Sequence, residues 1–87
     1  ITGGGLVENT ERVIEDGQKI RIDWDSWEWL PIFELIMSEG NVPIDDMRRS
    51  FNLGLGLVFV VDPKHVDSLS SHLNNLQEGY SIIGEVY

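Results

Sequence analysis

The residues best suited to chemistry stand in the opening stretch ITGGG, which includes three consecutive glycines, Gly3 to Gly5. So much backbone freedom is costly to order, so either a turn or a ligand should need it. Backbone N–H groups before a helix can hold a phosphate. The run lacks both the glycine spacing of a dinucleotide fingerprint and the Gly-Lys-Ser/Thr of a P-loop. From these residues alone an anion nest and a plain turn stay open, with the turn favoured.

A second informative stretch is SFNLGLG, which places a polar Asn52 and two spaced glycines, Gly54 and Gly56, just before an apolar run. Glycines at this position indicate close backbone approach or unusual dihedral angles. Alternatively, Asn52 hydrogen-bonds to its own backbone in a helix-to-strand turn. The sequence favours the two interpretations equally.

The other candidate groups have simpler explanations. Trp24, Trp27 and Trp29 could stack on a ligand, but indoles bury large areas and are more often part of a core. No basic residues interleave with them, which weakens a role in nucleobase stacking. His65 and His72 are expected on the solvated face of one helix, not in a metal site. We therefore predict no metal ligands, and the sequence identifies no catalytic residue.

Composition sets the class of protein. The chain has 87 residues, 41% of them hydrophobic, which suits a single globular domain. A net charge of −9 with only six Lys and Arg argues against nucleic acid or an acidic membrane surface as a partner. No apolar run approaches the ~20 residues that span a bilayer. The absence of cysteine fits a reducing compartment and excludes disulfides.

The pattern along the first part of the chain predicts one strand and three helical pieces. Residues 6–14 suggest a short helix or two irregular turns. Alternating Ile20 and Ile22 predict a half-buried strand over residues 19–23. Pro31 should begin a helix that stops at Gly40. A further helix is expected over residues 43–50, with acidic residues first and basic residues last.

The second part predicts a strand, a helix and a strand. Residues 55–61 form a continuous apolar run, typical of a strand buried on both faces. Asp62 and Pro63 favour a helix start, Gly79 its end, and residues 80–87 a last strand. The expected fold class is therefore α/β (α+β), with a mixed sheet of about three strands covered by helices. A central strand with only two candidate neighbours suggests either missing strands or dimerisation.

Taken in order, these landmarks resemble one family, the aminoimidazole ribonucleotide synthetases, or phosphoribosylformylglycinamidine cyclo-ligases. The resemblance rests on the stretches ITGGGLVENTERVI, DSWEWLPIFELIMSEGNVPIDDMRRSFNLGLGLVFVV and IIGEV, which cover nearly the whole chain. Two departures are conservative: Leu30 stands where the family usually has proline, and Ser50 where it has threonine. A histidine that commonly precedes Ile1 in the family lies outside this sequence.

The resemblance implies that residues 1–87 are a single partial domain, the latter part of the PurM-like C-terminal domain of the cyclo-ligase. The complete enzyme is a cytoplasmic dimer that uses ATP and Mg. It closes the imidazole ring of formylglycinamidine ribonucleotide in de novo purine biosynthesis. We expect the fragment to be inactive alone and to need no cofactor by itself. By resemblance, the substrate- and phosphate-binding residues are Thr2, Gly3, Gly4, Gly5, Asn9 and Asn52.

Two other functions remain as alternatives. The chain could belong to a different PurM-like ATP-using enzyme, although PIFELI and SFNLGLGL argue against this. It could instead be a non-catalytic interaction module that docks through its tryptophans. We also expect a homodimer, because unpaired strand edges and uncovered apolar surface favour association.

Overall fold

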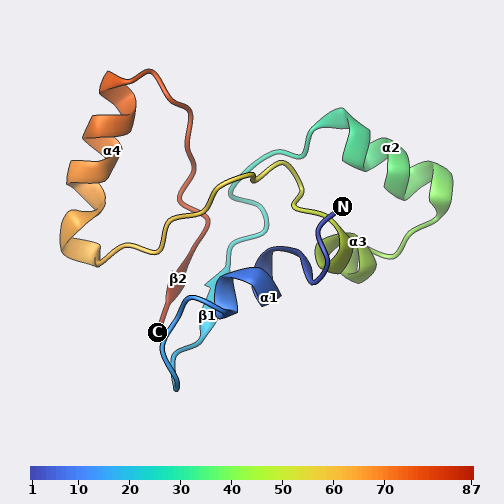
Figure 1. The fold of residues 1–87 in the computed structure, drawn as a ribbon. Helices are drawn as coiled ribbons and strands as arrows, with labels where there is room; N and C mark the ends of the chain where they lie inside the picture. Colours follow the sequence, from blue (N-terminus) through green and yellow to red (C-terminus); the bar gives the residue numbers. More distant parts are fainter.

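The computed structural model describes residues 1–87, which form short helices and one pair of strands. In Figure 1, α2 and α4 lie at opposite ends of the molecule, while α1, α3 and the two strands lie between them. The elements are, in chain order, α1 (Gly5–Glu11), β1 (Ile20–Ile22), α2 (Pro31–Gly40), α3 (Ile44–Ser50), the short 3-10 helix η1 (Pro63–His65), α4 (Val66–Asn75) and β2 (Gly84–Val86).

Helices α2 and α3 follow the sequence signals closely. Pro31 occupies the first turn of α2, and Asn41 ends the helix in the left-handed region, with φ of 50°. An asparagine tolerates this conformation better than most residues. In α3, acidic residues fill the first turn and basic residues the last, which complements the helix dipole. The predictions for both helices are confirmed.

The start of the C-terminal helix is also confirmed, but its end differs. Asp62 Oδ1 accepts a hydrogen bond from the Lys64 N–H at 3.0 Å and so caps η1, which leads directly into α4. We predicted that the helix would continue to Gly79. It ends at Asn75 instead, because Gln77 adopts a left-handed conformation with φ of 56° and the Glu78 N–H closes on the Leu73 carbonyl.

The sheet has two antiparallel strands, with Ile20 opposite Val86 and Ile22 opposite Gly84. Backbone hydrogen bonds in both directions between Lys19 and Tyr87 continue the pairing beyond the strands. The sequence predicted both of these strands, although each is shorter than expected. Gly84 permits the close pairing, since a Cβ there would overlap the Arg21 carbonyl.

The predicted central strand and the strand–helix–strand unit are absent. Residues 55–61 form no strand and pair with no neighbour, so the sheet has two strands instead of about three. Burial on both faces was also a wrong expectation, because the side chains of Leu57 and Phe59 are 76% and 58% exposed. Apolar, β-branched sequence favours a strand, but strand hydrogen bonds need a second segment alongside, which hydrophobicity does not specify.

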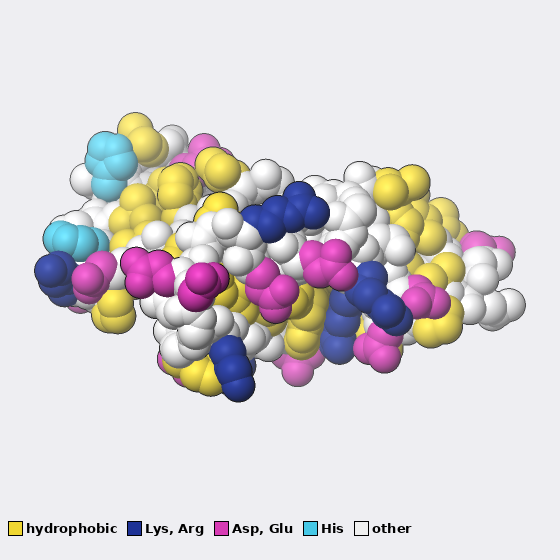
Figure 2. All heavy atoms as spheres, turned by 60° about the horizontal axis from the view of Figure 1, so that its bottom comes forward, with side chains coloured by type: hydrophobic (Ala, Val, Ile, Leu, Met, Phe, Trp, Pro, Cys, Tyr) yellow, Lys and Arg dark blue, Asp and Glu magenta, His cyan; other side chains and the backbone are white.

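The core is small and lies where α1 packs on α3. Its buried side chains are Leu6, Met47 and Leu53, of which Met47 is 0% and Leu53 1% exposed. The radius of gyration of 14.3 Å exceeds the about 12 Å typical of a compact chain this long. Figure 2 accordingly shows hydrophobic side chains at both ends of one face, with carboxylates spread between them.

Two of the tryptophans, Trp24 and Trp27, lie against this core and are half-buried. The Trp27 Nε1–H donates to the Leu53 carbonyl at 3.0 Å, and the Trp24 and Trp27 rings are 5.9 Å apart. The Arg48 guanidinium stacks 4.4 Å from the centre of the Trp24 ring. Trp29 is half-buried as well. The packing role favoured by the sequence therefore describes Trp24 and Trp27 well.

Candidate functional site

The glycine run forms a turn that is tied to the end of α3. Gly4 and Gly5 have φ angles of 86° and 62°, in the left-handed region that favours glycine. The Thr2 N–H donates to the Ser50 carbonyl at 2.7 Å, and the Gly5 N–H donates to the Thr2 carbonyl at 2.8 Å. The turn thus joins the first residues of the chain to a segment nearly fifty positions later.

Gly5 also has a packing role that needs no ligand. A Cβ built on Gly5 would overlap the carbonyl oxygen of Arg48, so α1 can approach α3 only where the side chain is missing. Gly3 differs, because a Cβ there would meet no atom within 4 Å. The three glycines therefore have different structural constraints, which the sequence alone did not distinguish.

Asn9 closes over the glycine turn from the next turn of α1. Its Nδ2 donates to the carbonyl of Gly3 at 3.1 Å and to that of Gly5 at 2.6 Å. Its Oδ1 accepts a hydrogen bond from Arg12 Nη1 at 3.2 Å. The whole carboxamide is therefore engaged within α1 and its turn.

Asn52 hydrogen-bonds to its own loop, as one of the two interpretations predicted. Its Oδ1 accepts from the Gly54 N–H at 2.9 Å, and its carbonyl accepts from the Leu55 N–H at 3.1 Å. Leu53 and Gly54 have φ angles of 54° and 94° within this turn. The Nδ2 group makes no hydrogen bond in the structure, so both of its N–H donors remain available.

Four of the six predicted site residues meet in one hollow of about 270 Å³. Thr2, Gly5 and Asn9 line it from the glycine turn and α1, and Asn52 lines it from the loop after α3. Gly3 and Gly4 belong to the same turn but do not line the hollow. The remaining lining residues are Leu6, Thr10, Val13, Leu55, Gly56, Leu57, Val58 and Val60.

No charged side chain lines this hollow, although the chain carries a net charge of −9. Its apolar wall comes mainly from residues 55–60, which sequence analysis had assigned to a buried strand instead of a binding surface. No local signal could have revealed that this run lies beside α1, since the contact joins distant segments. The hollow can offer a ligand an apolar face, the Thr2 hydroxyl and the free Asn52 amide.

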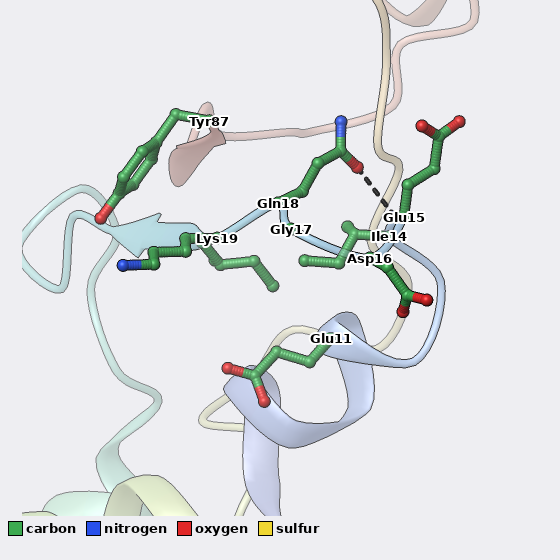
Figure 3. Close-up of a pocket in the computed structure, with 9 residues that line it drawn as sticks. Glu11, Ile14, Glu15, Asp16, Gly17, Gln18, Lys19 and Tyr87 are labelled. Atoms are coloured by element: carbon green, nitrogen blue, oxygen red, sulfur yellow. Dashed lines mark hydrogen bonds between the residues drawn. The ribbon is translucent and has the colours of Figure 1, made fainter.

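A second hollow, of about 440 Å³, lies between the end of α1 and the start of β1. Figure 3 shows Glu11, Glu15, Asp16 and Lys19 around it, with their charged ends pointing in different directions. The dashed line in Figure 3 marks the 2.8 Å hydrogen bond from the Glu15 N–H to Gln18 Oε1. None of the predicted site residues lines this hollow.

The structure holds no group of three or more His, Cys, Asp or Glu side chains that could bind a metal ion. None of the helices has the length and apolar character that crossing a bilayer requires. The candidate site is the smaller, uncharged hollow, because four of the predicted site residues line it and none lines the larger one.

Comparisons with known proteins agree with the resemblance in the sequence. The family model for the C-terminal domain of AIR synthase related proteins matches residues 1–87. A phosphoribosylformylglycinamidine cyclo-ligase from Pseudothermotoga lettingae is 42% identical over 86 residues, which are 99% of this chain and 26% of the relative. One from Coxiella burnetii is 43% identical over 86 residues, or 24% of the relative.

A bifunctional purine biosynthetic protein, purD, from Dictyostelium discoideum is 40% identical over 86 residues, which are 99% of this chain and 11% of that protein. The chain thus spans about a quarter of the cyclo-ligases that it matches, and less of the bifunctional protein. The fold and the site define a domain of mixed helices and strands, in which the glycine turn and two asparagines line one recess. The chain belongs to the AIR synthase related family and corresponds to its C-terminal domain.

Proposed function

We propose that this chain forms one wall of the substrate site of a phosphoribosylformylglycinamidine cyclo-ligase. In that reaction the imidazole ring of formylglycinamidine ribonucleotide is closed to give aminoimidazole ribonucleotide, in purine biosynthesis and in the cytoplasm. The observation that carries the proposal is the shared hollow. Thr2, Gly5, Asn9 and Asn52, chosen from the sequence by resemblance, line one recess although up to fifty positions separate them.

The chemistry of the hollow suits binding and orientation. The Thr2 hydroxyl and the Asn52 Nδ2 make no hydrogen bond within the chain, so both can donate to a substrate oxygen. The lining side chains include none that would act as a general base, because all are apolar, hydroxyl or carboxamide groups. The wall of Leu55, Leu57 and Val58 would exclude water from one side of a bound ring. These groups would hold the substrate in a reactive geometry.

The glycine turn offers a second kind of contact. The N–H groups of Gly4 and Leu6 donate to no acceptor within the chain. By resemblance we assign the glycine turn to the phosphate of the ribonucleotide, which would contact its backbone N–H groups. The Glu8 carboxylate, which lies against Gly4, would have to turn away from the phosphate. Thr2, Gly3, Gly4 and Gly5 would thus hold the phosphate end of the substrate.

ATP supplies the reaction with a phosphoryl group that activates the formyl oxygen, which a substrate nitrogen displaces as phosphate. By resemblance, the residues that hold Mg and ATP belong to the part of the cyclo-ligase that this chain does not match. The chain spans about a quarter of such an enzyme, so we expect it to be inactive alone.

A chimera tests the proposal directly. The matching segment of the Pseudothermotoga lettingae cyclo-ligase is replaced by residues 1–87, and aminoimidazole ribonucleotide formation is followed with and without ATP. We expect ATP-dependent product from the chimera and none from the isolated chain. A chimera that folds, as judged by cooperative unfolding, but forms no product would overturn the proposal when the parent enzyme is active in the same assay.

We also propose that the protein associates as a homodimer. The unpaired run 55–61 exposes Leu57 and Phe59, and the two-stranded sheet has two open edges. Such surfaces favour pairing with another copy. Sedimentation equilibrium of the 87-residue chain over a range of concentrations should show a dimer, whereas a monomer throughout would contradict this proposal.

A further inference from the structure

The peptide group between Leu53 and Gly54 is held by two side chains. The Leu53 carbonyl accepts a hydrogen bond from the Trp27 Nε1–H at 3.0 Å, and the Gly54 N–H donates to Asn52 Oδ1 at 2.9 Å. Neither polar group has a backbone partner. In a trans peptide the C=O and the N–H point in opposite directions, so this one peptide links Trp27 on one side to Asn52 on the other.

The loop needs a contact of this kind. Leu53 has a φ of 54°, which a leucine adopts only at a cost, and Gly54 has a φ of 94°. Because glycine tolerates many backbone conformations, the peptide before Gly54 can turn over unless it is held. The buried Leu53 side chain locates the loop in the core. The bond from Trp27 is the only hydrogen bond between residues 52–56 and the rest of the chain.

The Trp27 indole has a defined position from which to donate. Its ring packs against that of Trp24 with 5.9 Å between the ring centres, and the Arg48 guanidinium stacks 4.4 Å from the centre of the Trp24 ring. Trp27 lines neither of the two hollows, whereas Asn52 lines the smaller one. Trp27 therefore acts on the candidate site through the loop, without contact to a ligand.

The orientation of this peptide decides what Asn52 can offer a ligand. Because the Gly54 N–H occupies Oδ1, the two hydrogens of Nδ2 have no partner in the chain. If the peptide turned over, the Leu53 carbonyl would take the place of the Gly54 N–H. The carboxamide would then rotate so that Nδ2 donates to that carbonyl, and Asn52 would present an acceptor where it now presents donors.

We propose that Trp27 is a positioning residue, which holds the Leu53–Gly54 peptide so that Asn52 presents hydrogen-bond donors to the substrate. This inference rests on the proposed function, because it states how the Asn52 amide is prepared to bind a substrate oxygen. The packing of Trp27 and its effect on the site are separable, since phenylalanine keeps an aromatic ring but lacks the indole N–H.

The test uses Trp27→Phe in the cyclo-ligase chimera, with Trp29→Phe as the matched control. Both replace an indole by a phenyl ring in the same segment, but only the Trp27 indole donates a hydrogen bond. We expect Trp27→Phe to raise KM for formylglycinamidine ribonucleotide roughly threefold to tenfold, the effect of about one net hydrogen bond. KM for ATP should stay unchanged, and Trp29→Phe should change neither value.

A double variant separates positioning from packing. Asn52→Asp keeps the acceptor for the Gly54 N–H but has no donor to present, so in that background Trp27→Phe should change the substrate KM by less than about twofold. An equal effect of Trp27→Phe in both backgrounds would refute the inference, as would an unchanged substrate KM in the single variant. A chimera that is inactive without any substitution would refute the proposed function instead.

A measurement by NMR on the 87-residue chain needs no activity, so it tests the positioning of the loop by itself. The Trp27 indole N–H should exchange with solvent more slowly than those of Trp24 and Trp29. In Trp27→Phe the order parameter of the Gly54 amide should fall while those of α3 stay as in the parent, and in Trp29→Phe both should be unchanged. Equal exchange of the three indoles, or an unchanged Gly54 order parameter in Trp27→Phe, would overturn the inference.

Discussion

Gly5 and the carbonyl of Arg48 lie so close together that a side chain at Gly5 would overlap the carbonyl oxygen. This contact joins the first turn of α1 to the last turn of α3, beside the buried side chains of Leu6 and Met47. Because the core is this small, the distance between the two helices depends on the absence of a Cβ at position 5. Gly5 therefore has a structural role that does not depend on any ligand.

Gly5→Ala should destabilise the chain strongly. The substitution adds a methyl group against backbone atoms and places alanine at a φ of 62°, where it is strained. Each effect costs of the order of 1–3 kcal/mol, so we expect the free energy of unfolding to fall by about 2 kcal/mol or more. Urea unfolding monitored by tryptophan fluorescence measures the change.

Gly3→Ala provides the matched control for that experiment. It adds the same methyl group to the same turn, but where no atom lies within 4 Å and no positive φ is recorded. Its unfolding free energy should stay within about 0.5 kcal/mol of the parent. Equal destabilisation by the two alanines would show that the close approach to Arg48 does not matter.

Arg48 has two opposing effects on stability. Their relative sizes decide whether replacing it raises or lowers the free energy of unfolding. Its stack on Trp24 is worth about 0.5–1 kcal/mol at a partly exposed site. Its Nε is buried without a hydrogen-bond partner, which costs about 1–3 kcal/mol. Arg48→Met keeps the apolar stem and removes both, so stability should be unchanged or slightly increased. A loss above about 1 kcal/mol in urea unfolding would mean that the stack dominates.

The Arg21–Glu85 pair joins β1 to β2 directly across the sheet, at 3.2 Å. The Glu85 hydrogen bond, followed by the charge of Asp23, raises the pKa of Arg21. Because the pKa of Arg21 is raised in the folded state, the Arg21 interactions stabilise that state at all pH values below the ordinary arginine pKa. That contribution is lost only as the pH rises through the raised value. Arg21 therefore adds no pH dependence near neutrality.

Glu85→Gln should destabilise the strand pair only slightly, because both partners are well exposed and water screens their attraction. The difference from the parent should vanish in high salt. Thermal unfolding in low and high salt measures both points, and a difference that persists in high salt would argue against an electrostatic origin.

The sequence predicted the local structure well and the long-range structure less well. Pro31, Asp62 and the charge pattern of α3 specified helix starts, because caps and dipole effects act within one turn. The end of α4 was misplaced, because Gln77 took a left-handed conformation that glycine was expected to provide. Residues 55–61 were misassigned to a strand, since strand pairing depends on a partner elsewhere in the chain.

For the candidate site too, the sequence predicted which residues take part but not how they contact one another. Resemblance supplied Thr2, Gly5, Asn9 and Asn52, and the structure brings them to one hollow. Their binding roles stay predictions. The brace from Asn9 to the Gly3 and Gly5 carbonyls was not predictable in detail, because an asparagine on a helix can equally face a ligand. Only the directions of its hydrogen bonds distinguish bracing from binding.

Asn52→Asp tests whether the free amide of Asn52 binds substrate. The carboxylate can still accept the Gly54 hydrogen bond that Oδ1 accepts now, at 2.9 Å, so the turn should survive. The Nδ2 donor is lost, and a negative charge enters a hollow that has no charged lining. In the cyclo-ligase chimera we expect kcat/KM for formylglycinamidine ribonucleotide to fall by about tenfold or more.

Asn52→Ala separates this effect from folding. It removes the acceptor of the Gly54 bond as well, so it should lower the free energy of unfolding by about 1 kcal/mol, whereas Asn52→Asp should change it by less than about 0.5 kcal/mol. Steady-state kinetics and urea unfolding of both variants provide the comparison. If Asn52→Asp kept the parent kcat/KM, Asn52 would be a loop residue only, and the hollow would have to bind substrate through Thr2 and the glycine turn.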